Sequence, residues 1–388
     1  MNIAIFTNNY LPNPYGVTTS IESFRQEFER AGHTVYIFAP QFENYKDKNR
    51  KVFRYPSFDI NYKISFPLPI PFSFELEKKI KKLKIDIIHA QHPNLLGSMA
   101  MHWAKKKKIP IVFTWHTIYD KYTHYTPLLP QKFSAHWIIK NSVRYANRVD
   151  KVIVPTDSVK KIIQAWGVKN KNIRTIPTGV DEDNFKDANG KRIREELGIE
   201  DDKKIILSIS RLTEEKNVIF LVDEVIKSLK NNPKTVFILG GDGYLKEKLI
   251  QAVNRADVGE QVFFVGLISR NEIKDYMDLA DIFVYASQSE TQGTIITEAM
   301  YMGLPIVAID SLGVGDLLDN NRTAFLVSEK KNNFSARLDR VLSREEDARK
   351  IGKNAQKEAF QKYTDRVCAS RMLEVYQNLI SGFEKSEK

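Results

Sequence analysis

The sequence predicts an α/β protein built from two doubly wound parallel sheets. Its 388 residues suit two domains, because a domain commonly holds about 100–200 residues. Short continuous apolar runs, which are typical of parallel strands buried on both faces, alternate with helical patterns. This alternation occurs twice, and a stretch that contains Pro and Gly separates the two series at 176–180.

The first series opens with an apolar run at 2–7 and a turn-rich stretch at 8–16. Apolar residues then recur at helical spacing over 17–31, Gly32 ends that helix, and a strand pattern follows at 35–39. This order predicts a βαβ unit. The pattern repeats with strands expected at 85–90, 111–115 and 152–155 and helices expected from about 95 and over 133–147.

The second series starts with a strand at 204–210 and a helix whose apolar side carries Val218, Leu221, Val222 and Val225. Two such series imply two sheets, each with helices on both faces. The other elements expected here are strands at 236–239, 262–265, 282–285 and 305–308, helices at 270–279 and 293–302, and a helical tail over about 331–384.

Composition excludes several classes of protein. No run of about 18 apolar residues occurs, so no membrane-spanning helix is expected. The first strand pattern starts at Asn2, so we expect no signal peptide. Cys368 is the only cysteine, which excludes an intramolecular disulfide and a cysteine-based zinc site. Together these features favour the reducing cytoplasm.

The formal net charge of +11 is unevenly distributed. Residues 1–178 hold 28 basic and 12 acidic residues, a net of +16, whereas the remainder holds 31 basic and 36 acidic residues, a net of −5. This asymmetry favours contact between the first half alone and an anionic surface. Ordinary solvated lysine-rich surfaces are the alternative interpretation. A nucleic-acid-binding protein is disfavoured, because no recognised nucleic-acid motif is present.

In open parallel sheets, ligands bind beyond the carboxyl ends of the strands. Glu290 lies in such a loop, and Glu298 follows about a turn and a half into the next helix. Gly293, between them, allows close approach of the main chain, and the start of the helix offers N–H groups to a phosphate. Glu298 is suited to accept hydrogen bonds from a vicinal diol such as ribose. A helix cap and a solvated glutamate are the alternative interpretation of this pair.

Two cations, Arg211 and Lys216, follow the strand at 204–210. A planar guanidinium and a compact ammonium together suit a diphosphate, although charges at a helix start give the same pattern. The run Gly240-Gly-Asp-Gly243 would let a nucleotide base pack against the main chain, or form a plain βα turn.

The first half offers Gly16 at a helix start and an aromatic, hydroxyl-rich segment over 115–125 that includes His116 and Tyr125. Aromatic rings and imidazole or hydroxyl donors suit sugar binding. A metal site made of histidines has His89, His92, His116 and His124 as candidates, but no ligating carboxylate is adjacent to them. The acidic run at 181–183 lies on the expected linker, and we expect no metal.

Taken together, these motifs resemble the retaining glycosyltransferases of family GT4, which have the GT-B fold of two Rossmann-like domains facing across a cleft. The resemblance spans nearly the whole chain. It implies an acceptor-binding domain over 1–178, a nucleotide-sugar-binding domain over 179–364 and a helix over 365–388 that returns to the first domain. The motifs that carry the resemblance are Arg211 with Lys216, the Gly-Asp-Gly turn, Glu290-x7-Glu298, Ala299-Met300 and Gly303-Leu-Pro305.

Within GT4 the sequence is similar to the bacterial diacylglycerol glucosyltransferases. The carriers of this finer likeness are Ser289-Glu-Thr-Gln-Gly293, the opening Tyr10-Leu-Pro-x3-Gly-Val17 and His116-Thr-x7-Tyr125. Two positions depart from the common pattern. Gln292 stands where many members have Phe, and Tyr15 precedes Gly16 where many have a pair of glycines.

The resemblance implies a role for each candidate residue. Arg211 and Lys216 would hold the donor diphosphate, Glu298 the ribose and Glu290 the hydroxyls of the transferred sugar. His116 would contact the sugar near its 6-hydroxyl. The expected catalytic residues are His116, Glu290, Arg211 and Lys216, and the expected donor-binding residues are Gly16, Arg211, Lys216, Gly243, Gly266 (with main chain to Arg270), Glu290, Gly293, Thr294 and Glu298.

Fixed cations stabilise the charge that grows on a leaving diphosphate, so no cofactor is expected beyond the nucleotide-sugar donor, for which the resemblance implies UDP-glucose. The resemblance also implies retention, with the leaving phosphate taking the acceptor's proton.

The segment 65–84 predicts a membrane-docking surface, because a proline-bounded apolar patch adjoins a run of lysines. A loop packed on its own domain is the alternative interpretation. We therefore expect a peripheral enzyme on the inner face of the cell membrane that uses diacylglycerol or a glycolipid as acceptor. A soluble or polysaccharide acceptor, a mannosyltransferase and, more remotely, a sugar-nucleotide epimerase stay open. The expected membrane and acceptor residues are Phe66, Leu68, Phe72, Lys78, Lys79, Lys81, Lys82 and Tyr125, and those accompanying them are Ile70, Phe74 and Lys84.

Overall fold

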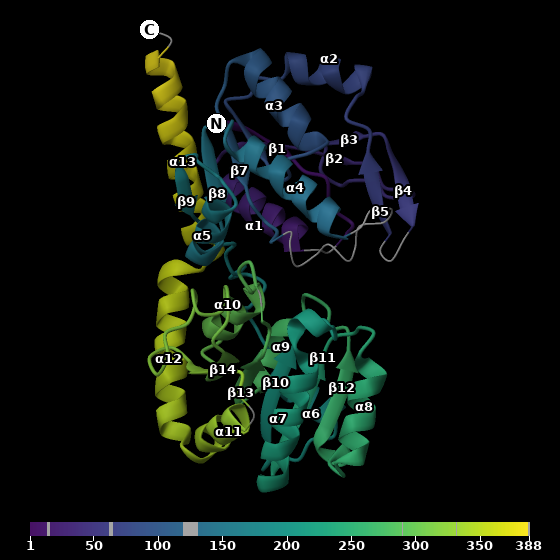
Figure 1. Ribbon diagram of the computed structural model, residues 1–388, viewed down its shortest axis with the longest axis vertical. Helices are drawn as coiled ribbons and strands as arrows, with labels where there is room; N and C mark the ends of the chain where they lie inside the picture. Colours follow the sequence, from purple (N-terminus) through teal and green to yellow (C-terminus); the bar gives the residue numbers. More distant parts are fainter. Residues whose placement is uncertain (14–15, 62–64, 119–130, 289, 331, 387–388) are drawn as a thin grey trace. The chain divides into compact units, whose positions relative to one another are not determined.

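The computed structural model describes residues 1–13, 16–61, 65–118, 131–288, 290–330 and 332–386 (Figure 1). The chain divides into two compact units. The N-terminal unit comprises Met1–Gly179 together with Asp365–Lys388, and the C-terminal unit comprises Val180–Thr364.

The N-terminal unit contains a seven-stranded parallel sheet in the order β3-β2-β1-β6-β7-β8-β9. All its strands run parallel, and β1 lies between β2 and β6, so the carboxyl ends of the central strands meet at one edge. The order confirms the doubly wound sheet that the apolar runs predict. The strands are β1 (Asn2–Phe6), β2 (Thr34–Pro40), β3 (Val52–Tyr55), β6 (Ile87–Ala90), β7 (Ile111–Thr114), β8 (Lys151–Val154) and β9 (Ile173–Thr175).

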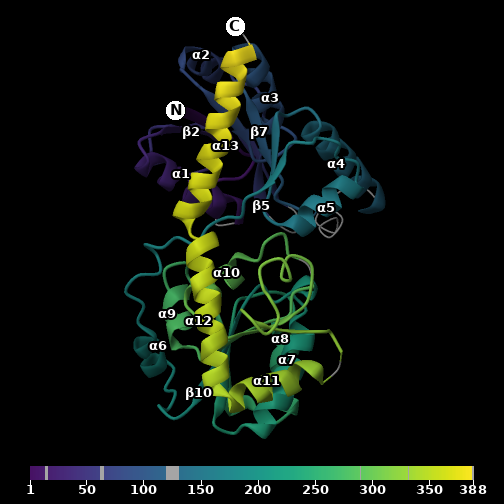
Figure 2. The same ribbon diagram turned by 90° about the vertical axis from the view of Figure 1, so that its left-hand side faces the viewer.

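The last helix of the chain, α13 (Asp365–Ser386), packs in the N-terminal unit. Its buried side chains Cys368, Met372 and Tyr376 share a core with strand β1 and with α1 (Gly16–Arg30). The ring of Tyr376 meets that of Phe28 edge-on, with centroids 5.6 Å apart. The predicted return of the final helix to the first domain is therefore confirmed (Figure 2).

A two-stranded antiparallel hairpin, β4 (Ser57–Asn61) and β5 (Ser65–Pro69), lies outside the main sheet. Phe58 is opposite Leu68 in its register. The hairpin is followed by α2 (Phe74–Lys82), which Ser73 caps by accepting a hydrogen bond from the Leu76 N–H. The other helices of this unit are α3 (Leu96–Lys107), α4 (Gln131–Ala146) and α5 (Asp157–Ala165).

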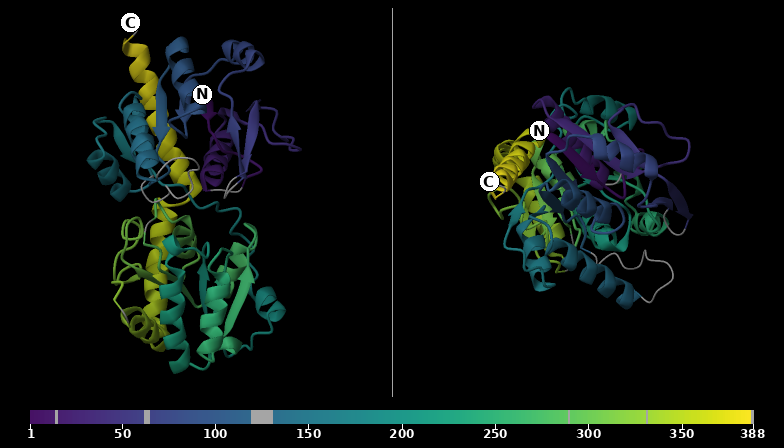
Figure 3. Two further views of the ribbon diagram at one scale, coloured as in Figure 1. Left: turned by 45° about the vertical axis from the view of Figure 1, so that its right-hand side comes forward. Right: turned by 90° about the horizontal axis from the view of Figure 1, so that it is seen from above.

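The C-terminal unit contains a six-stranded parallel sheet in the order β12-β11-β10-β13-β14-β15. Its faces carry two separate apolar cores, one shared with α7, α8 and α11 and the other with α6, α9, α10 and α12. Figure 3 shows helices on both sides of this sheet. The strands are β10 (Lys204–Ile209), β11 (Thr235–Gly240), β12 (Val262–Gly266), β13 (Ile282–Tyr285), β14 (Ile306–Ile309) and β15 (Phe325–Val327).

The helical tail is interrupted, whereas the sequence predicts helix throughout 331–384. Arg344 leaves helical geometry, with φ −123° and ψ 65°, and separates α11 from α12. A second break at Tyr363 and Thr364 precedes α13. The helices of the C-terminal unit are α6 (Gly190–Glu196), α7 (Val218–Asn231), α8 (Lys246–Arg255), α9 (Ile273–Leu279), α10 (Thr294–Tyr301), α11 (Asn333–Ser343) and α12 (Glu345–Lys362).

Candidate active site

A buried ion pair lies at the carboxyl ends of β10 and β13, which are neighbours in the sheet. Lys216 ends a short 3-10 helix over Glu214–Lys216, and its Nζ lies 2.5 Å from Oε1 of Glu290. Tyr285, the last residue of β13, donates a hydrogen bond of 2.7 Å to the same oxygen. The side chains of Lys216 and Glu290 are only 11% and 10% exposed, so solvent screens their attraction little.

Protonation in this cluster follows from its contacts. Burial by itself would raise the pKa of Glu290, but the charge and hydrogen bond of Lys216, aided by the Tyr285 hydroxyl, hold that pKa below its ordinary value. Burial and the Glu290 charge raise the pKa of Tyr285, so its hydroxyl stays protonated and donates. The cluster therefore presents a carboxylate that can accept sugar hydroxyls beside an ammonium that can meet a phosphate.

The loop that follows β14 contacts the main chain of Glu290. The Glu290 N–H donates to the Leu312 carbonyl over 2.9 Å. Gly313 has φ +80°, and a Cβ there would come within 2.1 Å of the Glu290 carbonyl oxygen, so no larger residue fits. Ser311 Oγ donates to the Ser287 carbonyl over 2.6 Å, which ties the same two loops together.

Gly293 and Thr294 begin the helix that carries Glu298. Gly293 has φ +74°, a conformation that favours glycine, and directly precedes α10. Thr294 is exposed at the first position of α10, whereas Glu298 is 2% exposed.

Glu298 pairs with Arg270 through a contact between Oε1 and Nη1. Burial raises the pKa of Glu298, and the charge and hydrogen bond of Arg270 oppose that rise. The Arg270 guanidinium also lies over the Phe185 ring, 5.8 Å from its centroid. The sequence predicts only a main-chain role near Arg270, so its ion pair with Glu298 is an addition from the structure.

Arg211 precedes Lys216 on the same loop but is less enclosed. Its side chain is 47% exposed, and Nη2 lies 3.1 Å from Oε1 of Glu215. The two expected diphosphate cations thus differ in burial, because Lys216 is 11% exposed beside Glu290 and Arg211 is 47% exposed.

The glycine-rich loop after β11 packs against the Arg211 loop. A Cβ on Gly241 would lie 1.8 Å from the Ser210 carbonyl oxygen, and one on Gly243 would lie 2.4 Å from that of Leu212. The Leu212 N–H donates to the Asp242 carbonyl over 2.9 Å. These glycines are therefore required by contact between two loops. Gly266, by contrast, has φ +73° and no atom within 4 Å of an added Cβ.

The N-terminal unit holds a cluster of neutral histidines, with His89 in β6, His92 after it and His116 after β7. His116 Nε2 lies 2.6 Å from Oε1 of Gln91, and burial lowers the pKa of His116 to about 3. The rings of His92 and His89 add to that shift. His89 is held between Tyr376 and Thr114 at 2.6 Å each, and burial lowers its pKa to about 3.

The other sequence-predicted residues fall at scattered places. Gly16 is exposed at the start of α1, with open space around a Cβ position. Phe66 belongs to β5, and Leu68 on the same strand is half-buried. Tyr125 lies outside the described residues, as does His124. The side chains that are exposed are Phe72, Lys78, Lys79, Lys81 and Lys82.

The structure thus gathers Lys216, Glu290 and Tyr285 at one strand edge, and Glu298 follows on α10. Sequence reasoning missed Tyr285, Gly313 and Arg270. A tyrosine that ends a buried strand and a glycine within Ser311-Leu-Gly-Val-Gly315 were the available signals. Among the described residues, no group of three or more His, Cys, Asp or Glu is arranged to hold a metal ion. Over the same residues, no helix is both long and apolar enough to span a bilayer.

Comparison with known proteins identifies the family. The profile of Glycosyltransferase Family 4 matches residues 14–184, and that of Glycosyl transferases group 1 matches residues 189–358. The chain is 35% identical over 321 residues to the alpha-monoglucosyldiacylglycerol synthase of Streptococcus pneumoniae, covering 79% of this chain and 71% of that protein. It is 30% identical over 324 residues to the enzyme of the same name from Acholeplasma laidlawii, covering 79% and 80%.

Solved structures show the same fold. Anabaena HepE in complex with UDP and glucose superposes with a TM-score of 0.78 at 18% identity, covering 98% of this chain and 100% of that one. Sucrose-phosphate synthase from Thermosynechococcus elongatus gives a TM-score of 0.78 at 19% identity, covering 98% and 99%. The chain therefore belongs to glycosyltransferase family 4 and is a hexosyltransferase with the two Rossmann-like units of the GT-B fold.

Proposed function

We propose that this enzyme transfers glucose from UDP-glucose to diacylglycerol at a membrane surface, with retention of the anomeric configuration. The buried Lys216–Glu290 pair carries the proposal. It sets a fixed cation beside a carboxylate that stays ionised, at the sheet edge where parallel α/β proteins bind ligands.

In this proposal the C-terminal unit binds the donor. The Lys216 ammonium contacts the diphosphate, and the exposed Arg211 guanidinium closes on it when the donor is present. Glu290, steadied by Tyr285, accepts hydrogen bonds from hydroxyls of the sugar. Glu298 accepts hydrogen bonds from the ribose hydroxyls, and Arg270 pairs with its carboxylate. Gly293 and Thr294 offer main-chain N–H groups to the donor.

Catalysis rests on stabilising the leaving group. Negative charge grows on the nucleoside diphosphate as the glycosidic bond breaks, and a preorganised contact to such charge is worth about 3–4 kcal/mol. Lys216 needs little reorganisation to make this contact because Glu290 already holds it. The departing phosphate accepts the proton of the acceptor hydroxyl, so the chain supplies no general base. We propose that turnover needs no metal, since Lys216 and Arg211 carry the required positive charge.

His116 contributes as a neutral group in this proposal. Its pKa of about 3 keeps the imidazole uncharged at neutral pH, and the Gln91 amide fixes the ring. A neutral, oriented imidazole can hydrogen-bond the 6-hydroxyl of the sugar without placing a further cation beside the glycosyl centre.

The acceptor side of the proposal rests on an aromatic patch, defined as Phe58, Ile70, Phe72 and Phe74. These side chains are 53%, 44%, 49% and 73% exposed. The rings of Phe72 and Phe74 pack edge-on, with centroids 4.9 Å apart. Apolar side chains exposed this close together mark an interaction surface.

Lysines extend this surface. Lys78, Lys79, Lys81 and Lys82 are exposed on α2, the helix that Phe74 begins. Near an anionic leaflet each such cation adds about 1 kcal/mol of attraction, and aromatic insertion adds apolar burial. We therefore propose peripheral attachment to the inner face of the cell membrane. The lipid product named by the relatives of 30–35% identity supports diacylglycerol as acceptor.

The test is a turnover assay with defined donors and acceptors. The purified enzyme is given UDP-glucose, UDP-galactose, UDP-N-acetylglucosamine or GDP-mannose, each with diacylglycerol in phosphatidylglycerol-containing vesicles or with a water-soluble diol. We expect turnover with UDP-glucose and diacylglycerol and a product whose anomeric NMR coupling shows the α configuration. Turnover confined to GDP-mannose or to the soluble acceptor contradicts the proposal.

A further inference from the structure

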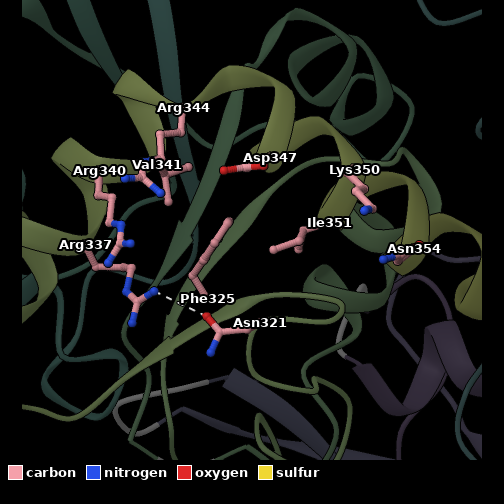
Figure 4. Close-up of a pocket in the computed structure, with 10 residues that line it drawn as sticks. All are labelled: Asn321, Phe325, Arg337, Arg340, Val341, Arg344, Asp347, Lys350, Ile351 and Asn354. Atoms are coloured by element: carbon pink, nitrogen blue, oxygen red, sulfur yellow. Dashed lines mark hydrogen bonds between the residues drawn. The ribbon is translucent and has the colours of Figure 1, made fainter.

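A cavity of about 490 Å³ opens between α11, α12 and β15 in the C-terminal unit. Its size falls within the range of about 300–1,000 Å³ that is usual for small-molecule sites. It shares no residue with the candidate donor site. Figure 4 shows the residues that line it: Asn321, Phe325, Arg337, Arg340, Val341, Arg344, Asp347, Lys350, Ile351 and Asn354.

Cations dominate the polar lining of this cavity. Arg337 and Arg340 stand three residues apart on α11, and Arg344 follows at the break before α12. Lys350 lies across from them on α12 (Figure 4). Asp347 is the single carboxylate in the lining.

These cations have few anionic partners. Arg337 contacts neutral groups, with Nη1 3.3 Å from Asn321 Oδ1 and its guanidinium 5.8 Å from the Phe325 ring centroid. Within the described ranges, Arg340, Arg344 and Lys350 form no ion pair, whereas the neighbouring Arg349 pairs with Glu345. Like charges on one helix face repel each other and destabilise the helix.

A role in helix stability explains only some of the four cations that line the cavity. A cation in the last turn of a helix complements its dipole, and Arg340 stands there in α11. That explanation does not extend to Lys350, which lies in the second turn of α12, near the positive end of that helix dipole. An anionic ligand would account for the gathering of all four cations at this cavity.

We propose that this cavity, hereafter the α11–α12 pocket, binds an anion that carries two or more phosphate groups. Guanidinium forks match phosphate oxygens in pairs, and Lys350 adds a point charge from the opposite wall. Arg337 and Arg340 are one turn apart on α11, about 5 Å along its axis, and Arg344 lies beyond the end of that helix, so the cations span more than one phosphate. The ligand is either a soluble polyphosphate ester or a diphosphate lipid headgroup, which share this chemistry.

The test uses inorganic triphosphate as the probe, titrated calorimetrically into the full-length protein at low salt. The test variant is the double substitution Arg340→Gln with Arg344→Gln, because both side chains are exposed and their loss leaves the core intact. The matched control is Lys353→Gln with Lys357→Gln, which removes the same charge from exposed positions of α12 outside the pocket. Lys216→Ala serves as a second control, since Lys216 belongs to the candidate donor site and does not line the pocket.

We expect the arginine variant to weaken triphosphate binding at least tenfold, and the lysine control and Lys216→Ala to change it less than twofold. The same proteins are then tested on phosphatidylcholine vesicles with and without cardiolipin, whose headgroup holds two phosphates. Loss of cardiolipin binding in the arginine variant identifies a lipid source, and loss of triphosphate binding alone identifies a soluble one. If the arginine variant keeps both affinities, or if Lys216→Ala abolishes triphosphate binding, the proposal is overturned.

Discussion

Lys216 and Glu290, which are 74 residues apart in sequence, meet with 2.5 Å between Nζ and Oε1. Parallel strands β10 and β13 bring them together, because both residues follow strands whose carboxyl ends lie at the same edge. The pair is nearly buried, so removing one partner leaves the other without its opposite charge in a poorly solvated place. This relationship links the stability of the C-terminal unit to its proposed donor site.

Glu290→Gln tests the pair through stability. The change removes the carboxylate charge that pairs with the Lys216 ammonium, and we expect the free energy of unfolding at pH 7 to fall by about 3 kcal/mol. Because the folded pKa of Glu290 is depressed below 4.5, its contribution is complete above that pH and is lost as pH falls through the folded value. Urea unfolding from pH 7 to pH 3 measures this, and the two proteins should converge in acid. A difference independent of pH contradicts the assignment.

Acid sensitivity of the N-terminal unit should come partly from its buried histidines. The pKa of His116 is lowered from 6.5 to about 3, so the folded state binds its proton only in strong acid. The stabilisation is complete above pH 6.5 and declines as pH falls towards 3. We expect His116→Gln to lose less stability than the wild type between pH 6.5 and pH 4, measured by urea unfolding. Equal losses, or an NMR midpoint for His116 near 6.5, contradict this.

Membrane attachment should depend on the aromatic patch. We expect Phe72→Ser with Phe74→Ser to reduce binding to phosphatidylglycerol vesicles at least tenfold in a flotation assay, since two inserting rings are removed. Phe360→Ser is the matched control, because Phe360 is 47% exposed on the C-terminal unit and outside the patch. Wild-type binding should also weaken as salt rises, since the α2 lysines act through screened attraction. If the double variant floats with the vesicles as the wild type does, the aromatic patch does not mediate membrane attachment.

The start of α10 should tolerate only glycine at position 293. An alanine there must adopt φ +74°, and its Cβ would lie 3.1 Å from Ile296 Cδ1. We expect Gly293→Ala to lower the free energy of unfolding by about 1–2 kcal/mol and to reduce turnover, because the N–H groups that we propose bind the donor would shift. Gly259→Ala is the control, since its Cβ meets only Asn254 Oδ1 at 3.7 Å. Thermal unfolding and steady-state rates measure both variants, and equal effects would contradict the assignment.

Long apolar strands could be predicted because burial on both faces leaves a direct trace in sequence. Strands β3 and β9 were missed because Arg54 and Arg174 interrupt their apolar runs, and β15 was missed because it holds only three residues. Arg54 is accommodated at the sheet edge by Asp47 and the Pro40 carbonyl. The break at Arg344 was also missed, because the helical pattern on either side continues through it.

In the candidate site too, some residues could be predicted from the sequence and others could not. Glu290, Glu298 and Lys216 were identifiable because they follow strands at ligand-binding edges. Tyr285 and Gly313 act on Glu290 through contacts that tertiary packing creates. The ion pair between Arg270 and Glu298 likewise joins a loop to helix α10 across 28 positions of the sequence, and no local pattern marks it.

The most direct test of the account is binding of UDP-glucose to the wild type and to Lys216→Met, measured by titration calorimetry. Methionine keeps the length of the side chain and removes the charge that should contact the diphosphate, a contact worth about 1.5–3 kcal/mol. Lys234→Met is the control, because its partner Asp202 lies at the surface away from the candidate donor residues. The account predicts that Lys216→Met weakens binding at least tenfold and that Lys234→Met does not. Equal affinity of Lys216→Met and the wild type, with both proteins folded, would contradict it.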